Sequence, residues 1–136
     1  MTDYPKFLPE GIPAWQQPFW QSLRDHAVKV QKCDSCGALR YVPKELCNRC
    51  FTTAATWTPI SGQGSVYTYT VVQRAPTPAY QEGAPYVIVH VDMDEGFRMI
   101  GSLTGVDADA VAIGQRVMAS YDDVSPEWTL LNFQMA

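Results

Sequence analysis

The chain has 136 residues, of which 46% are hydrophobic and 18% charged, and its formal net charge is −4. This composition excludes a disordered chain and fits one ordinary domain or two very small ones. No apolar run approaches the ~20 residues of a membrane span, and the N-terminal residues lack the basic and apolar regions of a signal peptide. We therefore expect a cytoplasmic protein that does not associate with membranes.

Residues 1–27 are predicted to form an extended, proline-containing arm followed by a short aromatic helix. Proline at position 18 suits a first helical turn, and the helix is expected to end near His26. In an apolar stripe, Trp15, Phe19 and Leu23 recur at four-residue steps, with Trp20 beside them. The stripe has two interpretations, packing within its own domain or anchoring another subunit. We predict from the second that these four side chains belong to a partner interface.

Residues 28–58 contain every cysteine of the chain, arranged as two Cys-x-x-Cys pairs separated by ten residues. Four thiolates at this spacing can bind one tetrahedral Zn²⁺, and four protein ligands leave no position for water. We therefore predict a structural zinc site rather than a catalytic one. Its ligands are Cys33, Cys36, Cys47 and Cys50.

The cysteines have two other interpretations. Two disulfides are disfavoured because we expect a reducing compartment, and a thioredoxin-like pair would come singly beside a βαβ pattern. Alternation over residues 28–32 and 39–42 instead predicts two strands beside the cysteine pairs. The result is a rubredoxin-like zinc ribbon that is too small to fold without its metal.

Residues 59–136 are predicted to form a five-stranded barrel of the oligonucleotide/oligosaccharide-binding (OB) type. Alternating segments predict strands over 65–72, 86–93, 97–103, 117–121 and 128–133. A glycine at position 96 predicts a hairpin, Gly101 permits a bulge or a sharp coil, and residues 107–114 predict a short helix or turn. This order suits an OB barrel. The fold class is therefore mainly β, with an N-terminal helix, a zinc ribbon and a C-terminal OB barrel.

The ordered motifs carry a family resemblance. The aromatic helix is followed by Val30-Gln-Lys-Cys-Asp-Ser-Cys-Gly, Cys47-Asn-Arg-Cys, Gly64-Ser-Val-Tyr-Thr-Tyr and Ala84-Pro-Tyr-Val-Ile, and then by Met99-Ile-Gly-Ser-Leu and Ile113-Gly-Gln-Arg-Val. In this order they resemble the DUF35 family of zinc-ribbon OB-fold proteins associated with acyl-CoA metabolism. The resemblance covers about residues 15–134.

The resemblance implies an accessory subunit in a hetero-oligomer, not an enzyme on its own. Family members form complexes with thiolase-like proteins, including acyltransferases and aldolases, and others pair with MaoC-type hydratases. The partner supplies the catalytic residues, and the accessory chain helps to shape the acyl-CoA channel. The resemblance therefore implies no catalytic residues in this chain.

Five cationic side chains of the ribbon are candidates for contact with acyl-CoA at such an interface. If the chain touches acyl-CoA, the phosphates need basic side chains. The candidates are Lys29, Lys32, Arg40, Lys44 and Arg49. The alternative is a solvated surface of the ribbon, and it stays open from the sequence.

Nucleic-acid binding is the alternative from another functional class, because OB barrels and zinc ribbons both serve it. Tyr67, Tyr69 and Tyr86 could stack on bases. Residues 51–136, however, carry three arginines against nine carboxylates, and this charge would repel a phosphate chain. Nucleic acid is therefore an unlikely partner of the barrel.

Overall fold

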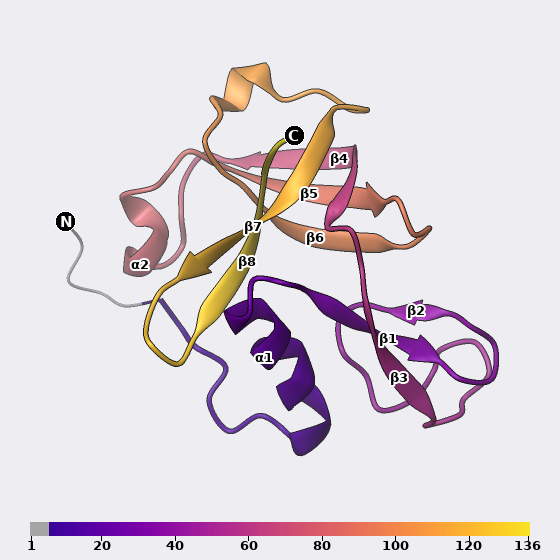
Figure 1. Ribbon diagram of the computed structural model, residues 1–136. Coiled ribbons are helices and arrows are strands. Elements are labelled where there is room, and N and C mark those ends of the chain that lie inside the picture. Colours follow the sequence, from indigo (N-terminus) through magenta and orange to yellow (C-terminus); the bar gives the residue numbers. More distant parts are fainter. Residues whose placement is uncertain (1–5) are drawn as a thin grey trace.

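A computed structural model describes residues 6–136, so residues 1–5 of the predicted arm lie outside the described part (Figure 1). Four short helices and eight strands follow one another along the chain. They are η1 (Ala14–Gln16), α1 (Gln17–Arg24), β1 (Lys29–Cys33), β2 (Leu39–Arg40), β3 (Ala55–Pro59), β4 (Gln63–Val72), α2 (Pro78–Gln81), β5 (Tyr86–Met93), β6 (Arg98–Leu103), η2 (Ala108–Ala110), β7 (Arg116–Asp123) and β8 (Thr129–Met135). No helix within residues 6–136 is long and apolar enough to cross a lipid bilayer.

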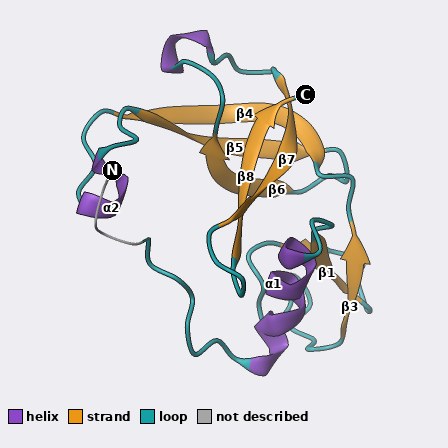
Figure 2. Ribbon diagram, turned by 60° about the vertical axis from the view of Figure 1, so that its left-hand side comes forward, coloured by secondary structure: helices purple, strands orange, loops and turns teal. Residues whose placement is uncertain are grey.

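Helix α1 lies between the ribbon strand β1 and the barrel strands β7 and β8 (Figure 2). Pro18 occupies its first turn, as the sequence predicts. Near its end the Ser22 hydroxyl donates to the Phe19 carbonyl (2.6 Å) and accepts from the Lys29 N–H (3.0 Å). The buried serine therefore joins the helix to the first strand of the ribbon.

The ribbon is a three-stranded antiparallel sheet in the order β2-β1-β3. Gln31 lies opposite Arg40 in one pairing and opposite Trp57 in the other. The third strand is missing from the sequence prediction. Its residues are exposed or half-buried along its whole length, so the segment lacks the alternation of buried and exposed residues that identifies a strand.

The barrel is closed in the order β4-β5-β6-β8-β7. Its pairs are antiparallel except where β6 meets β8 in parallel, at Leu103 and Phe133. The five strands correspond to the five predicted segments, and the mainly β fold class with helix, ribbon and five-stranded OB barrel is confirmed. Two connections contain short helices, α2 between β4 and β5 and η2 between β6 and β7.

The core of the barrel follows the predicted alternation, because the side chains at 87, 89, 91 and 93 are all buried. The predicted hairpin glycine, Gly96, has φ +88°. The bulge, however, lies in β4 between Val66 and Thr68 and not at Gly101. A Cβ at Gly101 would stand 3.1 Å from the ring of Phe133. Gly101 therefore serves the close packing of that ring.

Candidate metal centre and ligand cleft

The four cysteine sulfurs gather at one end of the ribbon, all within 4.8 Å of one another. The Sγ atoms of Cys33 and Cys50 are 3.4 Å apart, and those of Cys36 and Cys47 are 3.6 Å apart. Sulfurs in a disulfide are about 2.05 Å apart, and these thiols are free. Metal–sulfur bonds of about 2.3 Å in a tetrahedron place sulfurs about 3.8 Å apart. The cluster therefore fits one tetrahedral metal ion.

The two Cys-x-x-Cys turns have the same backbone geometry. The Gly37 N–H donates to the Cys33 carbonyl (2.9 Å), and the Phe51 N–H donates to the Cys47 carbonyl (3.0 Å). Both donors have positive φ, +75° for Gly37 and +63° for Phe51. A glycine adopts this conformation without strain, whereas a bulky side chain rarely does. The second turn is therefore strained where the first is relaxed.

Backbone N–H groups, burial and hydrogen bonds among the thiols together shift the pKa values of Cys33 and Cys36 in opposite directions. The Cys36 N–H, 3.5 Å from the Cys33 sulfur, is the largest cause that lowers the pKa of Cys33, to about 6. The N–H of Ala38 lowers the pKa of Cys36, but burial and hydrogen bonds with the other thiols outweigh it and raise that pKa to about 11. A divalent cation would reverse this rise, because it favours loss of the remaining proton. The donor set therefore fits a cation that binds all four sulfurs.

Arg40 is one of the five predicted phosphate contacts, and the structure corrects this prediction. Its side chain is 4% exposed. The guanidinium donates to the carbonyls of Lys44 and Thr52, at 3.3 Å each. A buried arginine that binds the backbone of its own ribbon is not available to a phosphate in solvent. The sequence lacked a signal for this, because arginine is usually exposed.

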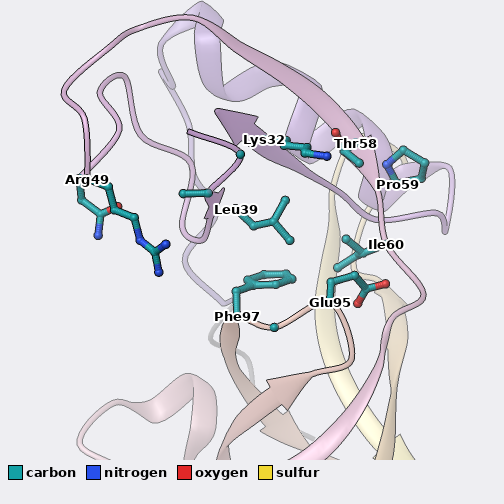
Figure 3. Close-up of a pocket in the computed structure, with 12 residues that line it drawn as sticks. Lys32, Leu39, Arg49, Thr58, Pro59, Ile60, Glu95 and Phe97 are labelled. Carbon is teal, nitrogen blue, oxygen red and sulfur yellow. The ribbon is translucent and has the colours of Figure 1, made fainter. Parts of the chain in front are cut away.

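Two of the other predicted cations, Lys32 and Arg49, line a cleft of about 490 Å³ between the ribbon and the barrel. Arg49 lies at one end of the cleft, and Lys32 lies beside Thr58 (Figure 3). Lys29 and Lys44 are exposed on the ribbon outside this cleft. The structure thus brings two of the five predicted cations to one cavity.

The floor of the cleft is apolar and comes from both parts of the chain. The ring of Phe97 lies below Leu39 of the ribbon, with Ile60 beside them (Figure 3). One carboxylate, Glu95, lies across from Arg49 and accepts from the Ser61 N–H at 2.7 Å. The cleft therefore combines a small apolar floor with two separate cations and one carboxylate, and the cations suit a molecule with spaced anionic groups.

The predicted interface stripe on α1 is largely internal. Phe19 and Leu23 are 4% and 1% exposed and belong to the core shared with the barrel. Trp20 is half-buried and meets the ring of Trp128 edge-on, with centroids 5.6 Å apart. This corrects the prediction for Phe19 and Leu23, because their contacts lie within the chain. Only Trp15 and Trp20 keep partial exposure.

An apolar groove of about 350 Å³ lies beside α1, where the partly exposed Trp20 meets strands β6 and β8. Ile100 of β6 lines this groove and is 41% exposed. Its carbonyl accepts from the Tyr41 hydroxyl of the ribbon at 3.2 Å. Ile100 could not be identified from the sequence, because the alternation of β6 shows which residues share a face but not which face meets solvent.

The histidine after α1 also has a role that the sequence does not reveal. His26 Nε2 lies 2.9 Å from an Asp123 carboxylate oxygen, and its ring stacks on Tyr121 at 4.9 Å. The pKa of Asp123 is lowered, first by the Thr129 hydroxyl and then by His26. This contact links the end of the helix to barrel strand β7.

The tyrosine face proposed for base stacking is covered in part by the chain itself. The Arg98 guanidinium lies 3.5 Å from the centroid of the Tyr67 ring, and its Nε contacts the Asp92 carboxylate at 2.7 Å. A base would therefore have to displace an ion-paired arginine. This arrangement disfavours the nucleic-acid alternative at Tyr67.

Family models match both parts of the chain. The model described as ChsH2, rubredoxin-like zinc ribbon domain, matches residues 20–54. The model described as ChsH2, C-terminal OB-fold domain, matches residues 57–122. These matches agree with the four-cysteine cluster and the barrel of the structure.

Three relatives show where similar chains occur. A DUF35 domain-containing scaffold protein of Methanocaldococcus jannaschii is 32% identical over 75% of this chain and 73% of its own. A probable enoyl-CoA hydratase alpha subunit of Thermomonospora curvata is 32% identical over 87% of this chain. A 3-oxo-4,17-pregnadiene-20-carboxyl-CoA hydratase alpha subunit of Mycobacterium tuberculosis is 33% identical over 82%. The chain spans only 37% and 35% of the two hydratase subunits.

Two solved structures share the fold. One is described as Ltp2-ChsH2(DUF35) aldolase and superposes with a TM-score of 0.81 at 28% identity, over 93% of this chain and 98% of that one. The other is a DUF35 protein of unknown function from Sulfolobus solfataricus, with a TM-score of 0.63 at 16% identity, over 93% and 89% of the two chains. At that identity the second supports the fold alone.

Proposed function

This chain belongs to the DUF35 family, and we propose from that membership that it is a non-catalytic subunit of an acyl-CoA-processing complex. We propose a thiolase-like partner, an acyl-CoA thiolase, acyltransferase or aldolase, which supplies the catalytic residues. One observation carries the proposal: the likeness over 93% of the chain to the DUF35 component of an Ltp2-ChsH2 aldolase. Two relatives are named DUF35 domain-containing scaffold protein, which also favours a non-catalytic role.

A second candidate is a subunit that supports a MaoC-type enoyl-CoA hydratase. The two hydratase alpha subunits at 32% and 33% identity favour it. The chain matches only about a third of each, at 37% and 35% of their length, so their activity could depend on the remaining two thirds. We therefore rank the hydratase partner second.

We propose that the four-cysteine cluster holds a structural Zn²⁺. A tetrathiolate set is typical of closed structural zinc sites, and the matching family model is described as a zinc ribbon. Thiolates also bind iron, so the test is metal analysis of freshly purified, reduced protein. About one equivalent of zinc is expected, and less than half an equivalent of total metal contradicts the proposal.

We further propose that the cleft between ribbon and barrel contacts the anionic end of acyl-CoA. Lys32 and Arg49 are separate cations, and CoA carries a pyrophosphate and a separate 3′-phosphate that could meet them. The apolar floor at Phe97 and Leu39 could receive the adenine ring. Lys32 and Arg49 are therefore the proposed phosphate contacts, and Lys29 and Lys44, which lie outside the cleft, are not.

The partner surface that we propose is the apolar groove beside α1, bounded by Trp20 and Ile100. Aromatic and aliphatic side chains at the centre of an interface supply most of the binding energy. Trp20→Ala would weaken assembly, but it would also disturb the contact with Trp128. Ile100 is the cleaner probe, because its side chain is 41% exposed.

The experiment co-expresses the chain with the thiolase-like or MaoC-like protein encoded beside it and measures assembly by light scattering after size exclusion. Ile100→Glu is expected to weaken assembly by about 2 kcal/mol, whereas the control Ile113→Glu, at 69% exposure in the loop between η2 and β7 and outside the groove, changes it little. Absence of any complex for the wild-type chain contradicts the proposed function. If both variants assemble equally well, the groove beside α1 is not the interface.

A further inference from the structure

The buried Arg40 lacks the ion pair that a charge in a protein interior normally needs. At 4% exposure it forms no salt bridge with any carboxylate in residues 6–136, and its Nε lacks a hydrogen-bond partner there. Its guanidinium donates two hydrogen bonds, and both go to backbone carbonyls. A buried charge is costly unless another charge compensates it. We therefore expect a negatively charged group near Arg40 that compensates its buried charge.

The contacts of Arg40 hold the segment that carries the second cysteine pair. Residues 44–52 contain no strand, so the sheet does not hold them through ladder hydrogen bonds. Arg40 donates to the carbonyls at both ends of this segment, Lys44 and Thr52. Gln31, directly opposite Arg40 in the sheet, accepts from the Lys44 N–H at 2.8 Å. These two buried side chains thus fasten the second cysteine turn to the strands beside the first.

One carbonyl connects Arg40 to the metal ligands. The Thr52 carbonyl accepts from the Arg40 guanidinium and also from the Cys47 N–H, at 3.0 Å. A divalent ion bound by four thiolates carries a formal charge of −2. Of the two carboxylates in residues 28–58, Asp34 accepts from Thr56 and Glu45 is exposed. The thiolate cluster is therefore the negative group of the ribbon that is linked to Arg40 through a shared hydrogen-bond acceptor, the Thr52 carbonyl.

We propose that Arg40 is a positioning residue of the metal centre, which holds the second cysteine turn and whose buried charge is balanced by the metal–tetrathiolate group. Metal binding and burial of Arg40 then stabilise each other. Because such linkage is reciprocal, removing the arginine weakens metal binding, and removing the metal leaves a buried charge unbalanced. The inference concerns the metal centre and is independent of any partner protein.

The test compares Arg40→Met with Lys29→Met, a control on an exposed cation of β1. Zinc affinity of the full chain is measured by competition with a chromophoric chelator, and cobalt substitution reports tetrahedral thiolate coordination through its absorption spectrum. Arg40→Met is expected to lower zinc affinity about 10- to 100-fold, as loss of outer-shell partners of metal ligands commonly does, and to alter the cobalt spectrum. Lys29→Met is expected to remain within about twofold.

Arg40→Lys separates charge from positioning and covers the case in which Arg40→Met does not fold. Lysine keeps the charge but lacks the fork that reaches two carbonyls, so its zinc affinity is expected to lie between wild type and Arg40→Met. Wild-type zinc affinity and an unchanged cobalt spectrum in Arg40→Lys and in any folded Arg40→Met would overturn the inference. Arg40 would then be an ordinary buried residue whose charge the carbonyl dipoles satisfy.

Discussion

In the barrel, the buried side chains are almost all apolar, with Val89 and Phe133 completely inaccessible to solvent. In the ribbon, six side chains are buried, and four of them are polar or are metal ligands: Gln31, Cys33, Arg40 and Cys47. Apolar packing stabilises a domain without any ligand, whereas a polar interior depends on satisfied charges and hydrogen bonds. The comparison shows that one short chain uses two different sources of stability.

Cys47→Ser should produce the largest effect, because the free energy of metal binding is the folding free energy of a small metal module. We expect loss of the metal and of amide protection in β1–β3, while β4–β8 keep most of theirs. Metal analysis and hydrogen exchange measure the two outcomes. The control Ser35→Ala lies within the first cysteine turn and should change neither. Equal loss of protection in both parts would show that the metal also maintains the barrel.

Phe133→Ala should have the next largest effect on stability, and it should act in the barrel and not in the ribbon. Removing a buried phenylalanine costs about 4 kcal/mol, and Phe133 of β8 is fully buried at the position where β8 pairs with Leu103 of β6. Denaturant unfolding measures the loss, and Ile113→Ala, at an exposed position, should stay within about 0.5 kcal/mol. Metal stoichiometry is expected to remain near one. Loss of metal in Phe133→Ala would mean that the ribbon depends on the barrel.

Phe51→Gly should give the smallest effect, and it is stabilising. Phe51 has φ +63° and is 74% exposed, so glycine removes about 1 kcal/mol of backbone strain and loses little packing. The control Gly37→Ala introduces the same strain at the matching position of the first turn and should cost about as much. The midpoint of unfolding at saturating metal measures both. A destabilised Phe51→Gly would show that the ring has a structural contact.

The sequence predicted features that depend on local patterns. The cysteine spacing predicted the sulfur cluster, and the alternation at 87, 89, 91 and 93 predicted the barrel core. It did not predict the strand at 55–59, whose side chains are half-buried or exposed throughout. Pattern arguments fail for such a strand, because its hydrogen-bonded neighbours determine it and its own hydrophobicity does not.

The predictions that failed concern tertiary packing. An aromatic stripe on a helix shows which face is apolar but not whether the same chain covers it, and here the barrel covers Phe19 and Leu23. A cationic cluster likewise does not reveal which cation is internal, so Arg40 could not be separated from Lys32 and Arg49 by sequence. Both distinctions require knowing which distant segments meet.

The ribbon is joined to the barrel at more than one place. The link from β3 to β4 is only residues 60–62, and there the Ser61 N–H binds Glu95. The Tyr41 hydroxyl donates to the Ile100 carbonyl, and the Val28 N–H donates to the Tyr121 hydroxyl of β7. These contacts restrict rotation of the ribbon relative to the barrel. The entropy of orienting ribbon and barrel is therefore already lost on folding. A molecule that contacts both parts therefore meets a preorganised surface and does not bear that cost when it binds.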